Sequence, residues 1–104
     1  MLGNFKVVTL CGSTKFKNEF IKVQQDLTLK GYIVLSLNIF THSDDKELTN
    51  EDILMLSKMH MEKINISDEI FVIDVDGYIG TATRNEISYA IQRNIPIKYY
   101  SKSY

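Results

Sequence analysis

One carboxylate of the chain, Glu86, stands where it could act on a bound small molecule. It follows an apolar run at residues 70–75 and a turn that contains Gly77 and Gly80. The segment after a buried strand lies at the carboxyl edge of a parallel sheet, where open α/β folds bind ligands. A glutamate there suits nucleophilic attack on the anomeric carbon of a sugar, whose transition state resembles an oxocarbenium ion. Glu86 also has a structural alternative, because residues 83–86 fit the S/T-x-x-E capping box and would place it in the first turn of a helix.

A second candidate segment, Cys-Gly-Ser-Thr-Lys at residues 11–15, follows the first apolar stretch of the chain. A glycine after a strand lets backbone amides approach an anion, and the next helix adds its positive N-terminal end. Ser13 and Thr14 offer hydroxyl groups, and Lys15 offers a positive charge that would suit a phosphorylated substrate. The order of residues is neither that of a Walker A loop nor that of G-x-G-x-x-G. The alternative is an ordinary helix cap made by Ser13 or Thr14.

Two further side chains have reactive groups. His60 lies at the border of the apolar face of an expected helix, where a packed histidine is more common than a catalytic one. Cys11 ends an apolar segment and is expected to behave as a small buried hydrophobic residue rather than as a nucleophile. Neither residue predicts a site by itself.

Periodicity predicts the elements that would position these side chains. Strands are expected at residues 5–10, 32–37, 70–75 and 96–100, and helices at 18–30, 49–66 and 84–93. A helical face is formed by Phe16, Phe20, Val23 and Leu27, and another by Ile53, Leu56 and Met59. Thr49, with an acid three residues later, predicts a capped helix start. The polar segment at residues 38–48 is expected to be a loop.

Strands that alternate with helices imply right-handed crossovers and a parallel sheet. The expected fold is therefore an α/β, Rossmann-like or flavodoxin-like three-layer sandwich with a four- or five-stranded parallel sheet. The run at residues 70–75 is almost continuously apolar, so we expect it to form a central strand that is buried on both sides.

Composition narrows the classes of function. The 104 residues suit one domain over residues 1–104, and the net charge of −1 provides no field that would attract a nucleic acid polymer. The single cysteine suggests a reducing compartment. No segment resembles a signal peptide or the ~20-residue apolar run of a membrane span, so a cytoplasmic protein without membrane contact is expected. Nothing in the residues calls for a cofactor or a metal.

Three stretches of the chain, VTLCGSTKF, MHMEKINISDEIFVID and GYIGTATRNEISYA, occur in an order that resembles the nucleoside 2-deoxyribosyltransferase-like superfamily. That superfamily includes the deoxynucleoside 5′-monophosphate N-glycosidases. The resemblance covers nearly the whole chain and implies a Rossmann-like sandwich. It also implies a homo-oligomer, a dimer or tetramer, in which a neighbouring chain lends residues to each site.

The resemblance implies roles for individual residues. Glu86 falls at the position of the family's nucleophile, within E-x-x-x-A, and His60 falls where characterised members carry an aspartate that handles the base. The residues expected to contact the sugar, base or 5′-phosphate are Cys11, Gly12, Ser13, Thr14, Lys15, Gly77, Tyr78, Gly80, Thr81 and Thr83. The chain departs from the family at His60, at Gly80, where relatives carry an acid or a serine, and at Ala82, where a glycine is usual.

The leading hypothesis is an enzyme that acts on the N-glycosyl bond of a nucleoside or nucleoside 5′-monophosphate, by transfer or by hydrolysis. Two alternatives stay open. A non-catalytic protein that binds or sequesters nucleotides would explain Gly80 and His60. A purely structural or interaction domain would use Ser13 and Glu86 only as helix caps.

Overall fold

The computed structural model of the chain describes residues 2–38, 40 and 47–104, and its centre is a four-stranded sheet in which all strands are parallel. The strand order is β2-β1-β3-β4. The strands are β1 (Val7–Gly12), β2 (Ile33–Leu35), β3 (Glu69–Ile73) and β4 (Ile97–Tyr99). The α/β class and the parallel sheet predicted from the sequence are thus confirmed.

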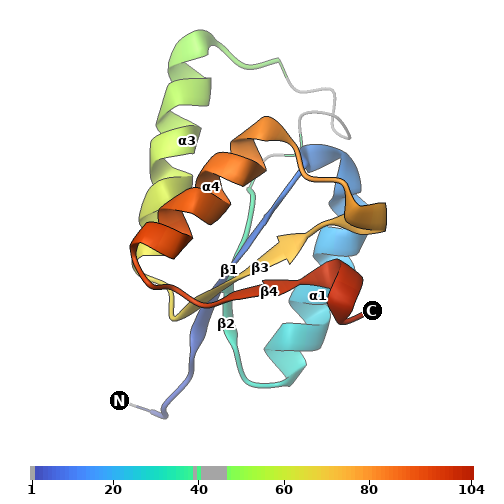
Figure 1. The fold of residues 1–104 in the computed structure, drawn as a ribbon. Coiled ribbons are helices and arrows are strands. Elements are labelled where there is room, and N and C mark those ends of the chain that lie inside the picture. The colour runs from blue at the N-terminus through green and yellow to red at the C-terminus, as the bar shows by residue number, and fades with distance from the viewer. Residues whose placement is uncertain (1, 39, 41–46) are drawn as a thin grey trace.

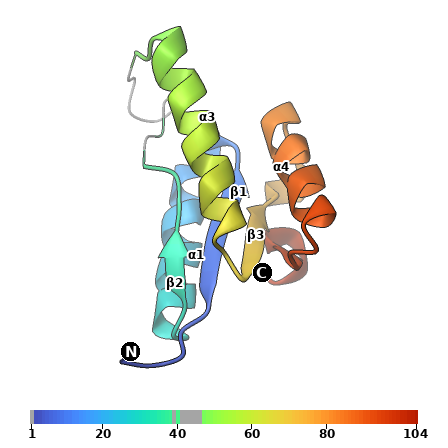
Figure 2. The ribbon, with the colours of Figure 1, turned by 90° about the vertical axis from the view of Figure 1, so that its left-hand side faces the viewer.

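Helices cover both faces of the sheet. They are α1 (Lys17–Leu29), α3 (Asn50–Asn65) and α4 (Thr81–Gln92), with short 3₁₀ turns η1 (Thr14–Phe16), η2 (Val75–Gly77) and η3 (Tyr100–Lys102). Helix α1 lies on one face, and α3 and α4 lie on the other (Figure 1 and Figure 2). The N-terminal half of α3 extends beyond the carboxyl edge of the sheet (Figure 2). Of the helices in the described ranges, none is long and apolar enough to cross a membrane.

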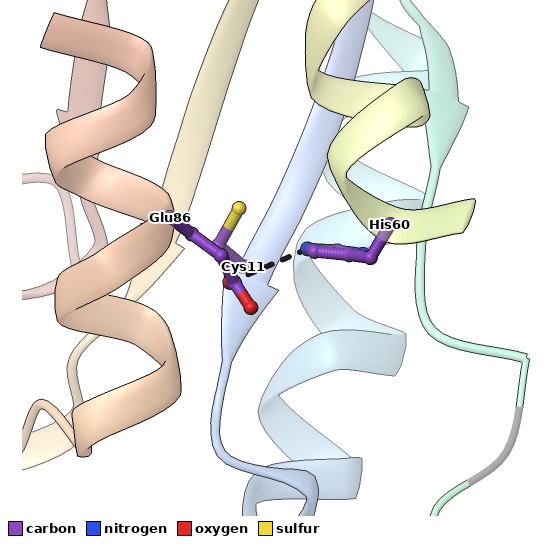
Figure 3. A group of neighbouring side chains, drawn as sticks. All are labelled: Cys11, His60 and Glu86. Carbon is purple, nitrogen blue, oxygen red and sulfur yellow. Dashed lines mark ion pairs between the residues drawn. The ribbon is translucent and has the colours of Figure 1, made fainter. Parts of the chain in front are cut away.

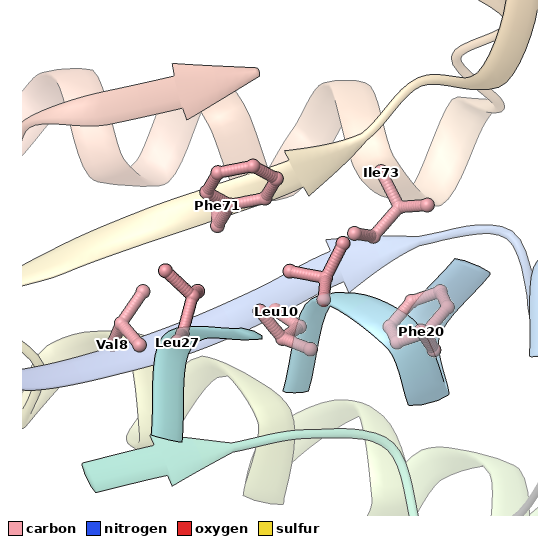
Figure 4. Packing of buried hydrophobic residues seen from close by; sticks show 7 residues of the cluster. Val8, Leu10, Phe20, Leu27, Phe71 and Ile73 are labelled. Atoms are coloured by element: carbon pink, nitrogen blue, oxygen red, sulfur yellow. The ribbon is translucent and has the colours of Figure 1, made fainter. Parts of the chain in front are cut away.

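The core has two halves because successive strand residues point to opposite faces of the sheet. On the α1 side, strand residues such as Leu10 and Ile73 pack against Phe20, Val23 and Leu27 (Figure 4). The opposite half combines strand and helix residues, namely Cys11, Ile70 and Val72 with Ile64 of α3 and Ala90 of α4. Every residue of β3 is buried, as predicted for a central strand.

Strand β1 is longer at its carboxyl end than the sequence predicted. Cys11 pairs with Val72, and Gly12 pairs with Ile73, so both belong to the sheet rather than to a loop. Gly12 has a φ of +154°, and a Cβ atom there would lie 3.0 Å from both the Cβ and the carbonyl oxygen of Ile73. The glycine is therefore required by close packing against β3. Strands β2 and β4 are shorter than predicted, with three residues each.

The predicted start of α3 is confirmed. The Thr49 side chain accepts a hydrogen bond from Asp52 N at 3.0 Å, and Asp52 Oδ2 accepts one from Thr49 N at 3.1 Å. This reciprocal capping box satisfies two amide donors that the helix itself leaves unpaired. The preceding polar segment has no helix or strand at residues 38, 40, 47 and 48, and the rest of the predicted loop lies outside the described residues.

The predicted start of α4 is wrong. The helix begins at Thr81 with Gly80 as its N-cap, and Arg84 N donates to Gly80 O at 3.0 Å. Glu86 is consequently the sixth residue of the helix, and residues 83–86 form no capping box. Thr83, the expected cap, is buried at 3% exposure within the first turn. Threonine is a weak helix former but a good cap, so the local pattern favoured a later start than the packed helix adopts.

Candidate functional site

A cavity of about 570 Å³ opens at the carboxyl end of β1. Strand β1 pairs with β2 on one side and with β3 on the other. The chain therefore continues to one side of β1 with β2 and to the other side with β3 and β4. Open α/β sheets bind ligands at such switch points. The residues that line the cavity are Gly12, Thr14, Leu37, Asn38, Leu48, Ile53, Leu56, Ser57, Met59, His60, Lys63, Ala82 and Glu86.

Glu86 and His60 meet in this cavity. Their side chains come from α4 and α3 and are 16% and 7% exposed, and Glu86 Oε1 lies 3.4 Å from His60 Nε2 (Figure 3). The separation is an electrostatic contact without the geometry of a hydrogen bond, since Glu86 Oε1 and both imidazole nitrogens have no hydrogen-bond partner in the described part of the chain. An unpartnered buried polar atom costs about 1–3 kcal/mol. Such atoms are available to a ligand that supplies the missing partners.

Cys11 completes a cluster with these two residues. The ligand atoms of Cys11, His60 and Glu86 all lie within 4.8 Å of one another. The pKa of the Cys11 thiol is raised well above its usual value, first because it is buried and second because the Glu86 carboxylate lies beside it. Cys11 is therefore held as a neutral thiol, unsuited to nucleophilic attack. Thiolate, imidazole and carboxylate are also ligands that Zn²⁺ accepts, so this cluster is the place where a metal could bind.

The residues predicted around the first loop divide into two groups. Gly12 and Thr14 line the cavity. Ser13 instead caps η1, where its Oγ accepts a hydrogen bond from Lys15 N at 3.3 Å. Lys15 is outside the cavity lining, and its Nζ lies 3.6 Å from the centre of the Tyr78 ring, which is a cation–π contact.

The turn between β3 and α4 reaches the cavity only through the start of the helix. Ala82 lines it, whereas Gly77, Tyr78, Gly80, Thr81 and Thr83 do not. Gly77 adopts a φ of +79° in η2, a backbone conformation that favours glycine. Its role is thus to turn the chain from β3 toward α4, which places Glu86 over the end of β1.

Sequence reasoning missed one wall of the site. Lys63 lies on α3 three residues after His60, and its Nζ donates hydrogen bonds to Asn38 Oδ1 and to Ser36 O, both at 2.7 Å. The signal was present in part, because residues three apart share a helix face. Ile53, Leu56 and Met59 were identified as a helical stripe, and the structure places that stripe along the cavity rather than in the core.

Comparison with known proteins adds no assignment. No protein-family model matches the chain, and no curated protein matches it either. The resemblance noted in the sequence stays a prediction, and the function has to be inferred from the chemistry of the site.

Proposed function

We propose that this protein is an enzyme that breaks the N-glycosyl bond of a nucleoside or nucleoside 5′-monophosphate, with Glu86 as the nucleophile. One observation carries the proposal. A buried glutamate oxygen without a hydrogen-bond partner faces a histidine at the carboxyl edge of a parallel sheet, inside a cavity of about 570 Å³. Cavities of roughly 300–1,000 Å³ are typical of small-molecule sites.

The cavity combines the features that such a substrate requires. The lining includes five apolar residues, Leu37, Leu48, Ile53, Leu56 and Met59. A planar base can bury its faces against side chains of this kind, because removal of apolar surface from water is favourable. Among the polar residues of the lining, Glu86 lies beside Cys11 at the carboxyl end of β1.

The proposed reaction has two steps. In the first, a Glu86 oxygen attacks C1′ of the sugar, and the bond from C1′ to the base nitrogen breaks with its electron pair passing to the base. His60, in its protonated form, donates a proton to the departing base. In the second step, water or the nitrogen of another base attacks C1′ and releases the Glu86 carboxylate, while neutral His60 accepts the proton that the attacking group loses. Water gives hydrolysis and a second base gives transfer.

The position of Lys15 bears on the phosphate group of the substrate. Because its Nζ lies against the Tyr78 ring and outside the cavity lining, Lys15 provides no support for a 5′-phosphate in this arrangement. The proposal therefore includes both nucleosides and their monophosphates.

A non-catalytic nucleotide-binding protein is the second candidate. Enzymes that act on glycosyl bonds commonly use two carboxyl groups. Among the described residues that line the cavity, Glu86 is the only one with a carboxyl group. If His60 does not replace the second carboxyl group, the site would bind nucleotides without cleaving them.

A direct experiment separates the two candidates. The protein is incubated with the common deoxynucleosides and their monophosphates, and free base is measured by chromatography beside a calorimetric titration of each compound. Release of base that is absent from the Glu86→Gln variant supports the enzyme. Binding without release supports the nucleotide-binding protein, and the absence of both contradicts each candidate.

A further inference from the structure

Lys63 is a positive charge in the cavity wall that has only neutral partners. Its two hydrogen bonds go to the carbonyl oxygen of Ser36 and to the amide oxygen of Asn38. No carboxylate among the described residues forms an ion pair with it. Burial lowers its pKa, which reflects the cost of holding an ammonium group away from water. An ammonium group has three donors, so one N–H is left for a ligand.

Asn38 extends the same donor surface. Its amide oxygen accepts from Lys63, an orientation assigned from the hydrogen-bond network, and its NH₂ group is then left for other partners. Both side chains line the cavity. Lys63 and Asn38 thus form a wall that offers N–H donors to a ligand. The amide oxygen of Asn38 is already occupied by Lys63, so the wall offers no side-chain acceptor.

A wall of donors discriminates among nucleobases. At the exocyclic position an oxo group accepts a hydrogen bond, whereas an amino group donates one and would face Lys63 donor to donor. A site that hydrogen-bonds one substrate disfavours the analogue whose donor group would face the donors of the site. In addition, the negative charge that develops on a departing oxo base spreads onto its oxygen, where a nearby ammonium group would stabilise it.

We propose that Lys63 and Asn38 form a base-selecting subsite that favours oxo bases over their amino counterparts. This inference rests on the proposed function, because it takes the base of a nucleoside as the group that occupies the wall. The position of Lys63 supports it, since residues three apart share a helix face and His60, the proposed proton donor to the base, is three residues before it. A base that receives a proton from His60 would therefore lie within reach of Lys63.

The competing explanation is that Lys63 only ties α3 to the end of β2. Loss of a purely structural contact would affect all substrates alike. The informative quantity is therefore the ratio of kcat/KM between an oxo nucleoside and its amino counterpart. We would measure kcat/KM for two pairs that differ by an oxo or an amino group, deoxyuridine with deoxycytidine and deoxyinosine with deoxyadenosine. The wild type is expected to favour the oxo member by about 10-fold or more, since a single specific polar contact commonly contributes that much.

Matched variants test the wall directly. Lys63→Met keeps the length of the side chain and removes its donors, so the ratio should fall to within about 3-fold of unity. Asn38→Asp places a carboxylate on the lysine and neutralises it, which should also lower the ratio even if Lys63→Met folds poorly. Lys58→Met, at an exposed position of the same helix, is the control and should keep the wild-type ratio. Unchanged ratios in both wall variants would overturn the subsite.

Calorimetric titration distinguishes failure of the subsite from failure of the proposed function. If wild type releases no base, but binds the oxo nucleosides more tightly and loses this preference in Lys63→Met or Asn38→Asp, the cleavage proposal is wrong and the subsite stands. If wild type binds the members of each pair equally, or binds none of them, the subsite is overturned whatever the turnover.

Discussion

Replacement of Glu86 by glutamine is the perturbation that most directly tests the site. Glutamine has the same length and also suits a helix interior, and Glu86 is the sixth residue of α4 rather than a cap. The substitution removes the nucleophilic oxygen while it keeps the volume that fills the cavity wall. Loss of a residue on which the covalent step depends commonly lowers kcat by roughly 10⁴-fold or more. We therefore expect base release by Glu86→Gln to fall below detection.

Although Glu86→Gln should abolish activity, we expect it to leave the stability of the protein unchanged or to increase it. In the wild type, a carboxylate that is only 16% exposed has one oxygen without a hydrogen bond, 3.4 Å from His60. The neutral amide removes the cost of burying the charge, estimated at about 1–3 kcal/mol, and loses the attraction to His60. The free energy of unfolding should thus be unchanged or higher by up to about 2 kcal/mol. For a domain of this size each kcal/mol shifts Tm by roughly 4–8 °C.

The assay is base release by chromatography together with thermal melts of both proteins and calorimetric binding of a deoxynucleoside. Glu62→Gln, at an exposed position of α3, provides the matched control and should keep both activity and Tm. With a nucleoside analogue whose sugar is released slowly in the second step, the sugar should stay attached to Glu86. The mass of the wild-type protein should then increase by that of the sugar, and the mass of Glu86→Gln should not change. Normal turnover in a folded glutamine variant would refute the role of Glu86 as nucleophile. A Tm more than about 10 °C lower would refute the stability argument.

Four further predictions concern the thiol, the sheet edge and the surface. The Cys11 thiol should react slowly with a thiol reagent until the protein unfolds; because its folded pKa is raised above the ordinary 9.0, the unfolded state loses the proton first, and melts should show stability falling as pH rises above 9. Gly12→Ala should lower the free energy of unfolding by about 2–4 kcal/mol in denaturant titrations, since its Cβ would lie 3.0 Å from β3 atoms; a change below about 1 kcal/mol would contradict this. Asp74→Ala should cost about 2 kcal/mol, because the buried Asp74 carboxylate accepts two hydrogen bonds from Ser101 at 2.8 and 2.6 Å, and a matched Asp74→Asn variant should recover part of the loss. Light scattering at tens of micromolar should show a homo-oligomer that Leu54→Lys dissociates, because Leu54 is 58% exposed on α3 among other exposed apolar side chains; a monomeric wild type would refute this.

Much of the fold could be predicted from the sequence because it depends on local patterns. The continuous apolar run before the glycine turn identified the central strand, and the observed β3 (Glu69–Ile73) is buried throughout. The Thr49 box identified the start of α3, since a cap and its partner lie three residues apart. Alternation of strands and helices predicted parallel pairing, as each pair of parallel strands requires a crossover.

The predicted boundaries of helices and strands were wrong where the local sequence preference and the tertiary packing disagree. The sequence at residues 83–86 fits the capping-box pattern, yet α4 begins at Thr81 with Gly80 as its N-cap, and Thr83 is buried inside the first turn. Likewise, Cys-Gly resembles a loop, but pairing with Val72 and Ile73 draws both residues into β1. In both cases contacts with distant residues outweighed a weak local preference.

Some features of the candidate site follow from local sequence patterns, and others depend on contacts between residues far apart in the chain. Glu86, His60 and Gly12 could be selected from the sequence, because each has a reactive group or lies at the end of an apolar run. Periodicity indicates which face of a helix is apolar but not what that face will meet. The strand order and the crossing of α3 over the sheet decide that Glu86 meets His60 and Cys11, and that Lys63 reaches Asn38 beyond β2. Those contacts join residues far apart in the chain, so only the tertiary structure could decide them.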